Sequence, residues 1–97
     1  MNRPVVAIIG SAMMDLSAYI DRIPAAGETL KGDSFTTGFG GKGANQAVMA
    51  AIAGAESYFI GAIGNDVFGA AIEENFKARG VNSKFLQKSE LPTGVAH

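Results

Sequence analysis

Two apolar runs along the chain predict strands that are buried on both faces. Pro4 to Gly10 is continuously apolar and β-branched, and Ser57 to Gly64 repeats this character. Phe85-Leu86 and the segment Pro92 to Ala96 begin further apolar stretches, each of which we expect to start a strand. A strand this close to His97 is expected to find little to pair with inside these residues. We therefore interpret residues 1–97 as the N-terminal part of a longer protein.

Two other segments carry apolar side chains at the 3.6-residue period of a helix. The run from Ala44 to Ala55 predicts a helix that ends near Gly54. Further along, Phe68, Ile72 and Phe76 recur at four-residue spacing. Asp66 and Gly80 suit the N-cap and the C-terminal stop of that second helix. Strands that alternate with helices imply βαβ units with right-handed crossovers, so the pattern predicts an α/β fold.

Between the first strand and the first helix, the pattern changes to that of exposed, extended chain. Leu16, Ala18 and Ile20 alternate with polar side chains, which predicts a half-exposed strand. A Pro-Ala-Ala-Gly turn follows at 24–27, and residues 29–39 are expected to be extended, with Gly32 and Gly38 as breaks. Residues 16–39 are thus predicted to be an antiparallel excursion from a parallel sheet, a shape suited to a lid or to an oligomer contact.

Four glycines gather at the start of the first predicted helix, between Gly38 and Gly43. Glycine adds no side chain to a core, but it lets a ligand approach bare backbone N–H groups. A helix start also offers unpaired N–H groups and a partial positive charge, which suit oxygen-rich or anionic ligands. A tight loop before a helix would explain the glycines but not Lys42, Asn45 and Gln46. We therefore expect a binding site here.

Two nucleotide-binding motifs share parts of this segment and fit it poorly. Gly38, Gly40 and Gly43 have the spacing of the dinucleotide fingerprint, but residues 11–37 separate them from the strand that this motif should follow directly. A phosphate-binding P-loop needs Ser or Thr after its lysine to hold magnesium, and here Gly43 follows Lys42.

Asp15 is the first charged residue after the first predicted strand. Ligands of open α/β sheets bind beyond the carboxyl ends of the strands, so Asp15 is a candidate ligand-binding carboxylate. The alternative is an aspartate that caps a turn, and position alone favours that alternative.

Composition excludes several classes of protein. The 97 residues are 47% hydrophobic with a formal net charge of -1, which argues against disorder and against a nucleic-acid partner. The absence of cysteine excludes disulfide scaffolds and cysteine-based zinc sites. The longest uncharged stretch, Gly43 to Ala55, is shorter than the roughly 20 residues of a membrane helix. No metal cluster is apparent, because His97 is the single histidine. Without cysteine or a stretch of membrane-spanning length, the chain is expected to be a soluble, cytoplasmic α/β protein.

The segment from Gly40 to Ala47, Gly-Gly-Lys-Gly-Ala-Asn-Gln-Ala, resembles the first signature of the ribokinase family, the PfkB carbohydrate kinases. Further matches follow in unbroken order over nearly the whole chain: Gly10-Ser11, Asp15-Leu16, Pro24 with Gly27-Glu28-Thr29, Gly54, Gly64, Asp66 with Phe68-Gly69, and Pro92 to Ala96. Within the family the motifs are most similar to those of ribokinases. The resemblance implies a three-layer αβα sandwich, with residues 1–97 as its N-terminal βαβ portion and residues 16–39 as small β lid strands.

The resemblance also implies an activity and a site. The enzyme would transfer the γ-phosphoryl group of ATP to the 5-hydroxyl of ribose with Mg²⁺, and a monovalent cation is a further candidate cofactor. The sugar would be held by Met13, Asp15, Gly40, Gly41, Lys42 and Asn45. The lid would exclude water from the reaction and form the contact of a homodimer. The family's catalytic aspartate, in a Gly-Ala-Gly-Asp motif, and its ATP pocket have no counterpart in these residues, so we expect the 97 residues alone to be inactive.

Met13 departs from the pattern, because many ribokinases carry Asn at this position. A methionine donates no hydrogen bond and accepts only weakly, so a sugar hydroxyl that lost its partner there would bind about 1–3 kcal/mol less well. Methionine also occurs here among ribokinases and deoxyribokinases. The alternatives are therefore a deoxyribokinase, a nucleoside kinase of the same family, or a non-catalytic module that binds sugar or dimerises.

Overall fold

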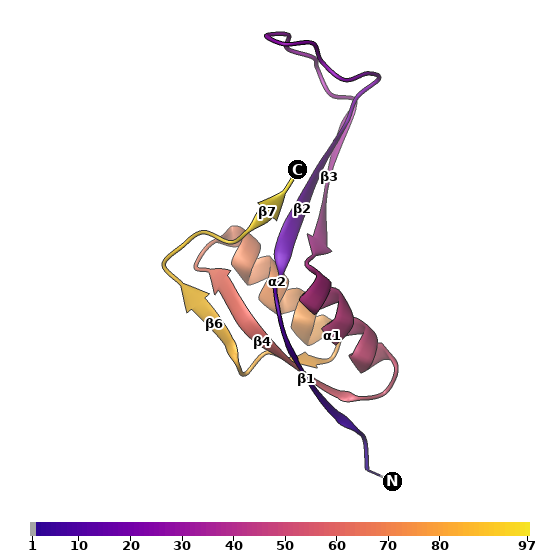
Figure 1. Ribbon diagram of the computed structural model, residues 1–97, viewed down its shortest axis with the longest axis vertical. Coiled ribbons are helices and arrows are strands. Elements are labelled where there is room, and N and C mark those ends of the chain that lie inside the picture. Colours follow the sequence, from indigo (N-terminus) through magenta and orange to yellow (C-terminus); the bar gives the residue numbers. More distant parts are fainter. Residues whose placement is uncertain (1) are drawn as a thin grey trace.

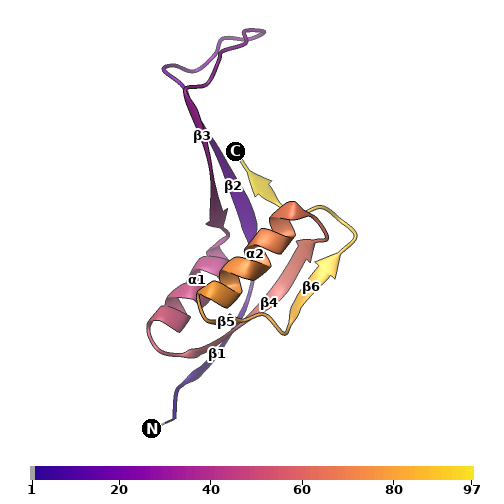
Figure 2. The same ribbon diagram turned by 180° about the vertical axis from the view of Figure 1, so that it is seen from behind.

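The computed structural model describes residues 2–97, which form two sheets and two helices. The first sheet is parallel, with β4 (Glu56–Gly64) between β1 (Val5–Ile9) on one edge and two short strands on the other. These two, β5 (Val81–Asn82) and β6 (Leu86–Ser89), pair with successive parts of β4. The helices α1 (Lys42–Ile52) and α2 (Val67–Ala78) lie together on one face of this sheet (Figure 2). The predicted α/β architecture is confirmed.

The second sheet is built on a long hairpin that projects away from the rest of the molecule (Figure 1). Its strands β2 (Met13–Tyr19) and β3 (Ser34–Gly40) are antiparallel. With this hairpin the molecule measures 58 Å along its longest axis and 18 Å along its shortest. The predicted antiparallel excursion is therefore confirmed, with strands that begin before residue 16 and end after residue 39. Gly38 is not a break in this excursion, because it lies inside β3 opposite Asp15.

Within residues 2–97, β1 and β4 are covered on one face and not on both as predicted. Residues of β1 alternate between half-buried and exposed, and Ile9 at its end is 81% exposed. On β4, Phe59 and Ile63 are fully buried while Ala62 between them is exposed. The physical reason is that α1 and α2 cover one face of the sheet, and no element of residues 2–97 covers the other.

The expectation that the last strand would lack a partner is also wrong. β7 (Val95–Ala96) pairs in parallel with β2, on the edge that β3 leaves open. The N–H of Met14 donates to the carbonyl of Gly94 over 3.0 Å and begins this pairing. The second sheet thus has the order β3-β2-β7, with the strand that carries Asp15 at its centre.

The core lies between the helices and the first sheet. Its largest members are Phe59 of β4 and Phe76 of α2, whose ring centroids are 4.8 Å apart. The buried positions of α1 are small, Gly43, Ala44 and Ala47, so this helix packs close to the strands. Asp66 caps α2 by accepting from the N–H of Gly69, as predicted. Neither helix in the part of the chain that the structure describes is long and apolar enough to cross a bilayer.

Candidate functional site

The residues singled out from the sequence come together in one hollow of about 630 Å³. It lies where the end of β1, the base of the hairpin and the first turn of α1 meet. The members predicted from the sequence are Met13, Asp15, Gly40, Gly41, Lys42 and Asn45. These residues come from β2, the end of β3 and the start of α1, so it is the fold that brings them together. Their role in binding stays a prediction.

The hairpin brings the carboxylate and the glycines to the same place. In β2, Met13 and Asp15 are two positions apart and so lie on the same face of the strand. Met13 is paired with Gly40 and Asp15 with Gly38. Asp15 therefore sits inside a strand, half-buried, and the interpretation of this residue as a turn cap is wrong.

Gly40 has no side chain because the Asp15 carboxylate occupies the space. A Cβ atom at residue 40 would lie 2.5 Å from Oδ1 and 2.7 Å from Oδ2 of Asp15. The backbone of Gly40 is outside the left-handed region, so the requirement for glycine is one of space and not of conformation. The carboxylate is thus stacked directly on the backbone that leads into α1.

Gly41 is required for a different reason. Its φ of 98° belongs to the region that side chains avoid, and a Cβ there would also collide with the carbonyl of Ser11. That carbonyl accepts from the N–H of Ala44 over 3.1 Å, which fixes the β1–β2 connection to the first turn of α1. No side chain caps this helix start, so the N–H groups of Lys42 and Gly43, which both line the hollow, keep their capacity to donate.

The end of β1 touches the helix through two glycines. A Cβ atom on Gly10 would lie 2.9 Å from the Cα atom of Gly43, and one on Gly43 would lie 2.8 Å from the Cα of Gly10. This backbone contact brings the strand end and the helix start close enough to share one ligand. Sequence reasoning identified both glycines in motifs but did not predict that they meet.

The hollow also contains two residues outside the predicted sugar-binding set. Ser11 and Gln46 line it together with the predicted set. For Gln46 a signal was present, because Lys42, Asn45 and Gln46 have the i, i+3, i+4 spacing of one helix face. For Ser11 the signal was the Gly10-Ser11 match to the family, which did not identify it as a binding residue.

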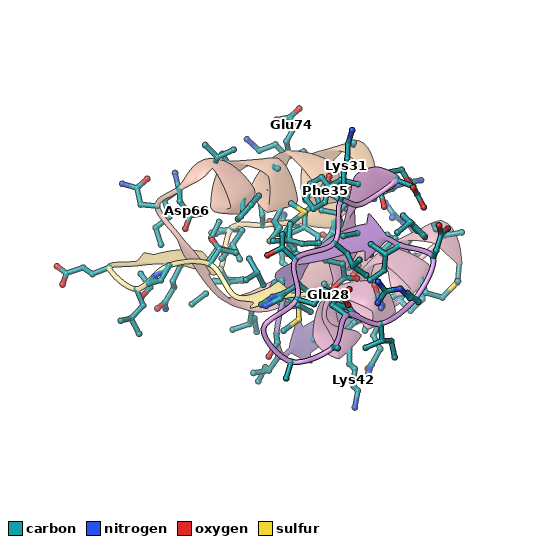
Figure 3. The ribbon with its side chains drawn as sticks, turned by 90° about the horizontal axis from the view of Figure 1, so that it is seen from above. Glu28, Lys31, Phe35, Lys42, Asp66 and Glu74 are labelled. Carbon is teal, nitrogen blue, oxygen red and sulfur yellow. The ribbon has the colours of Figure 1, made fainter. Side chains whose placement is uncertain are left out.

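Opposite charges flank the hollow. Asp15 contributes the negative charge from β2, and Lys42 the positive charge from the first residue of α1. Figure 3 shows the Lys42 side chain pointing outward, on the side of the view opposite Glu74 of α2. Neither Asp15 nor Lys42 takes part in an ion pair within residues 2–97. A carboxylate acceptor and an ammonium donor are therefore both free to bind a polar ligand.

The hollow is suited to a small polyol rather than to a metal. It combines a carboxylate, a side-chain amide, an ammonium group and bare backbone N–H groups, which match hydroxyls that both donate and accept. Within residues 2–97 no group of three or more His, Cys, Asp or Glu side chains could hold a metal ion.

Comparison with known proteins assigns a class to this arrangement. Residues 4–97 match the model of the pfkB family of carbohydrate kinases. The chain is 46% identical over 93 residues to a ribokinase of Bacillus subtilis, covering 95% of this chain and 32% of that protein. It is 40% identical over 83 residues to a deoxyribokinase of Salmonella typhi, covering 86% of this chain and 27% of that protein.

A solved structure shows the same fold. The ribokinase of Arabidopsis thaliana, in complex with ribose and ATP, superposes with a TM-score of 0.87 at 35% identity. The match covers 97% of this chain and 31% of that one. The chain thus spans less than a third of the length of each of these relatives.

Proposed function

The chain belongs to the pfkB family of carbohydrate kinases, and we propose that the whole protein is a ribokinase. It transfers the γ-phosphoryl group of ATP to the 5-hydroxyl of D-ribose, and residues 1–97 contribute most of the sugar site. The observation that carries this proposal is the Asp15 carboxylate stacked on Gly40, facing the uncapped start of α1 across one hollow.

The chemistry of the hollow supports a sugar ligand. Asp15 accepts hydrogen bonds from two sugar hydroxyls, and charged acceptors make the stronger hydrogen bonds. Lys42, Asn45 and the N–H groups at the start of α1 donate to the sugar from the other side. The hydroxyls are held by groups from two directions, which fixes the orientation of the sugar for transfer.

ATP is the proposed phosphoryl donor, with Mg²⁺ and a monovalent cation as further cofactors. Residues 2–97 contain no group of three or more His, Cys, Asp or Glu side chains that could hold a metal ion. We propose that the sites of these cofactors lie outside residues 1–97, which lack the family's Gly-Ala-Gly-Asp motif. The contribution of this chain is to bind and orient the acceptor sugar. We therefore expect the isolated 97 residues to bind ribose without phosphorylating it. The cytoplasmic location stays a prediction from the sequence.

The hairpin is proposed to be a lid with two unlike faces. The face of β2 that carries Asp15 continues with Ser17 and is turned toward the hollow. The opposite face carries Leu16, Ala18 and their neighbours on β3, Phe35 and Phe39, which are 62% and 45% exposed. In Figure 3, Phe35 and Lys42 lie on opposite sides of the view down the hairpin. We propose that the apolar face is the contact of a homodimer, because exposed aromatic side chains gather there.

The test uses the whole protein with ATP and ribose. Asp15→Asn keeps the size of the side chain but removes its charge, which weakens each hydrogen bond to a sugar hydroxyl. With a loss of about 1.5–3 kcal/mol, kcat/KM for ribose should fall about 10- to 150-fold. Glu74→Gln, which neutralises an exposed carboxylate on α2, is the matched control and should leave kcat/KM unchanged. A protein that forms no ADP in the presence of ribose would refute the proposal, as would an Asp15→Asn variant with full activity.

A deoxyribokinase is the second candidate, and Met13 favours it. Met13 lines the hollow opposite Gly40 and offers a sugar hydroxyl no donor. We expect the site to tolerate 2-deoxyribose better than one with Asn at this position. The measurement is the ratio of kcat/KM for ribose and deoxyribose with Met13 and with Met13→Asn. An unchanged ratio would contradict this role of Met13.

A further inference from the structure

A buried threonine lies at the junction between the two sheets. Thr93 is 6% exposed. Its hydroxyl donates to Oδ1 of Asp66 over 2.6 Å and accepts from the N–H of Gly64 over 2.8 Å. Its own backbone N–H donates to Oδ2 of Asp66 over 2.9 Å. The hydroxyl and the backbone N–H of Thr93 therefore both have partners within the protein.

Two glycines make this arrangement possible. A Cβ atom on Gly64 would lie 2.6 Å from Oδ2 of Asp66, and one on Gly69 would collide with the carbonyl of Gly64. The N–H of Gly69 donates to Oδ1 of Asp66 over 2.8 Å. We call Gly64, Asp66, Gly69 and Thr93 the Thr93 network. It joins the end of β4, the start of α2 and the segment before β7, and its donors hold the pKa of the Asp66 carboxyl below its usual value.

The Thr93 network is directly connected to the strand that carries Asp15. The residue after Thr93 is Gly94, whose carbonyl accepts from the N–H of Met14. Val95 and Ala96 then pair with Met14 and Asp15. β7 begins two residues after Thr93, so the Thr93 network holds the end of the strand that enters the pairing with β2.

We propose that Thr93 and Asp66 are positioning residues for the sugar site. They anchor β7 on the open edge of β2 and thereby fix Asp15 and Met13 at the hollow. With β7 in place, Asp15 is held between Gly38 of β3 on one side and Ala96 on the other. Neither Thr93 nor Asp66 lines the hollow, so their effect is exerted through the strand. The kinetic consequence rests on the proposed function, whereas the anchoring does not.

The variants separate anchoring from general stability. Thr93→Val keeps the shape of the side chain and removes its hydroxyl, whereas Thr93→Ser retains the hydroxyl. The control is Ser57→Ala, which removes another buried hydroxyl, bonded over 2.8 Å to the carbonyl of Ala47. That bond joins β4 to α1, and Ser57 has no place in the Thr93 network or in the hollow.

The first measurement is amide hydrogen exchange of Met14 and Asp15 in the whole protein without ligand. Thr93→Val should accelerate exchange of the Met14 amide by about fivefold or more, because its acceptor Gly94 is then held only through the N–H of residue 93 and not through the hydroxyl. Thr93→Ser and Ser57→Ala should leave this amide as protected as in the wild type. Equal protection of Met14 in Thr93→Val and the wild type would overturn the proposal.

The second measurement is steady-state kinetics with ribose and ATP. Thr93→Val should raise KM for ribose by about tenfold and change KM for ATP less than about twofold. Thr93→Ser should restore KM for ribose, and Ser57→Ala should not raise it. A KM for ribose that stays unchanged while Met14 exchanges faster would overturn the positioning role. If the wild type phosphorylates no sugar, the proposed function fails, and the exchange of Met14 alone decides the anchoring.

A milder variant covers the case in which Thr93→Val does not fold. Asp66→Asn keeps Oδ1 as an acceptor for the Thr93 hydroxyl and the Gly69 N–H, but it sets an amide group against the Thr93 N–H. This variant should accelerate exchange of the Met14 amide in the same direction as Thr93→Val. Wild-type exchange of Met14 in Asp66→Asn would overturn the proposal equally.

Discussion

One added methyl group, in the variant Gly40→Ala, tests whether the Asp15 carboxylate binds the sugar. The new Cβ would lie 2.5 Å from Oδ1 of Asp15, whereas ordinary contact begins at 3.4 Å, so the carboxylate must shift by about 0.9 Å. A hydrogen bond of about 2.7 Å from a sugar hydroxyl would then stretch to about 3.6 Å, beyond hydrogen-bonding distance. Losing one charged hydrogen bond costs about 1.5–3 kcal/mol, so Kd for ribose should rise about 10- to 150-fold.

The matched control for this variant is the same substitution two residues earlier. A Cβ on Gly38 would lie 4.0 Å from Cβ of Asp15, which is ordinary contact. Neither glycine has a left-handed backbone, so alanine at either position should reduce the entropy of the unfolded chain and stabilise by about 0.4–1 kcal/mol. In Gly40→Ala part of this gain is offset by displacement of the carboxylate. Gly38→Ala should therefore be at least as stable as the wild type and bind ribose within about twofold of it.

The assay is calorimetric titration of the whole protein with ribose, together with urea unfolding of each variant. Gly40→Ala should lose affinity while its unfolding midpoint stays close to that of Gly38→Ala. Equal affinity of the two variants would refute the reasoning, since it would mean that the position of the Asp15 carboxylate does not matter. If Gly40→Ala lost affinity and its urea midpoint also fell well below that of Gly38→Ala, the proposed role of the carboxylate would also be contradicted. The weaker binding of ribose would then come from unfolding of the protein.

Three further predictions address the surroundings of the site. The donors from Thr93 lower the pKa of Asp66 in the folded state. The ionised Asp66 therefore stabilises the fold at any pH above its pKa in the unfolded chain, and this stabilisation is lost as the pH falls through its pKa in the folded protein. In the wild type the urea midpoint should fall as the pH is lowered below about 4, and in Asp66→Asn it should fall less. The same fall in both proteins would contradict this prediction. Gly41→Ala should lower the free energy of unfolding by at least about 1–3 kcal/mol, because φ is 98° and the Ser11 carbonyl is in the way; a wild-type midpoint would argue against it. Phe35→Glu should convert a dimer to a monomer in sedimentation velocity without unfolding it, and a wild-type protein that is already monomeric would exclude the proposed lid contact.

Local sequence patterns predicted the helices and most of the strands, but they predicted the pairing between distant strands poorly. The helices α1 and α2 were found because their apolar period and the stops at Gly54 and Gly80, both with positive φ, are local properties. The pattern did not predict the two-residue strand β5, and it did not predict that β7 pairs with β2. Whether such short segments form strands depends on which neighbouring strand has an unpaired edge. Burial of β1 was overestimated because an apolar strand does not reveal which of its faces another layer covers.

The candidate site was predictable in its residue types but not in its packing. Glycines before a helical period indicate a helix start suited to a ligand, and the position after the first strand made Asp15 a candidate. The family resemblance then added Met13 and the expected role of Asp15 in sugar binding. The stacking of the Asp15 carboxylate on Gly40 comes from the β2–β3 register, which the sequence pattern did not specify. Likewise, the role of Thr93 emerges only when three segments meet, so no spacing along the chain could indicate it.

Within residues 2–97 the base of the hairpin is held more firmly than its tip, and this gradient suits the proposed lid. At Asp15, β2 is the centre of a three-stranded sheet, and the adjacent Met14 is 3% exposed. Within the described residues, β3 alone pairs with β2 at Tyr19, and a two-stranded hairpin in water is only marginally stable. Beyond it, the Arg22–Glu28 ion pair is exposed, and such pairs contribute about 0–1 kcal/mol. If Asp15 binds the sugar as proposed, its carboxylate is fixed before the sugar arrives, which avoids an ordering cost on binding, while the tip can move at little cost in stability.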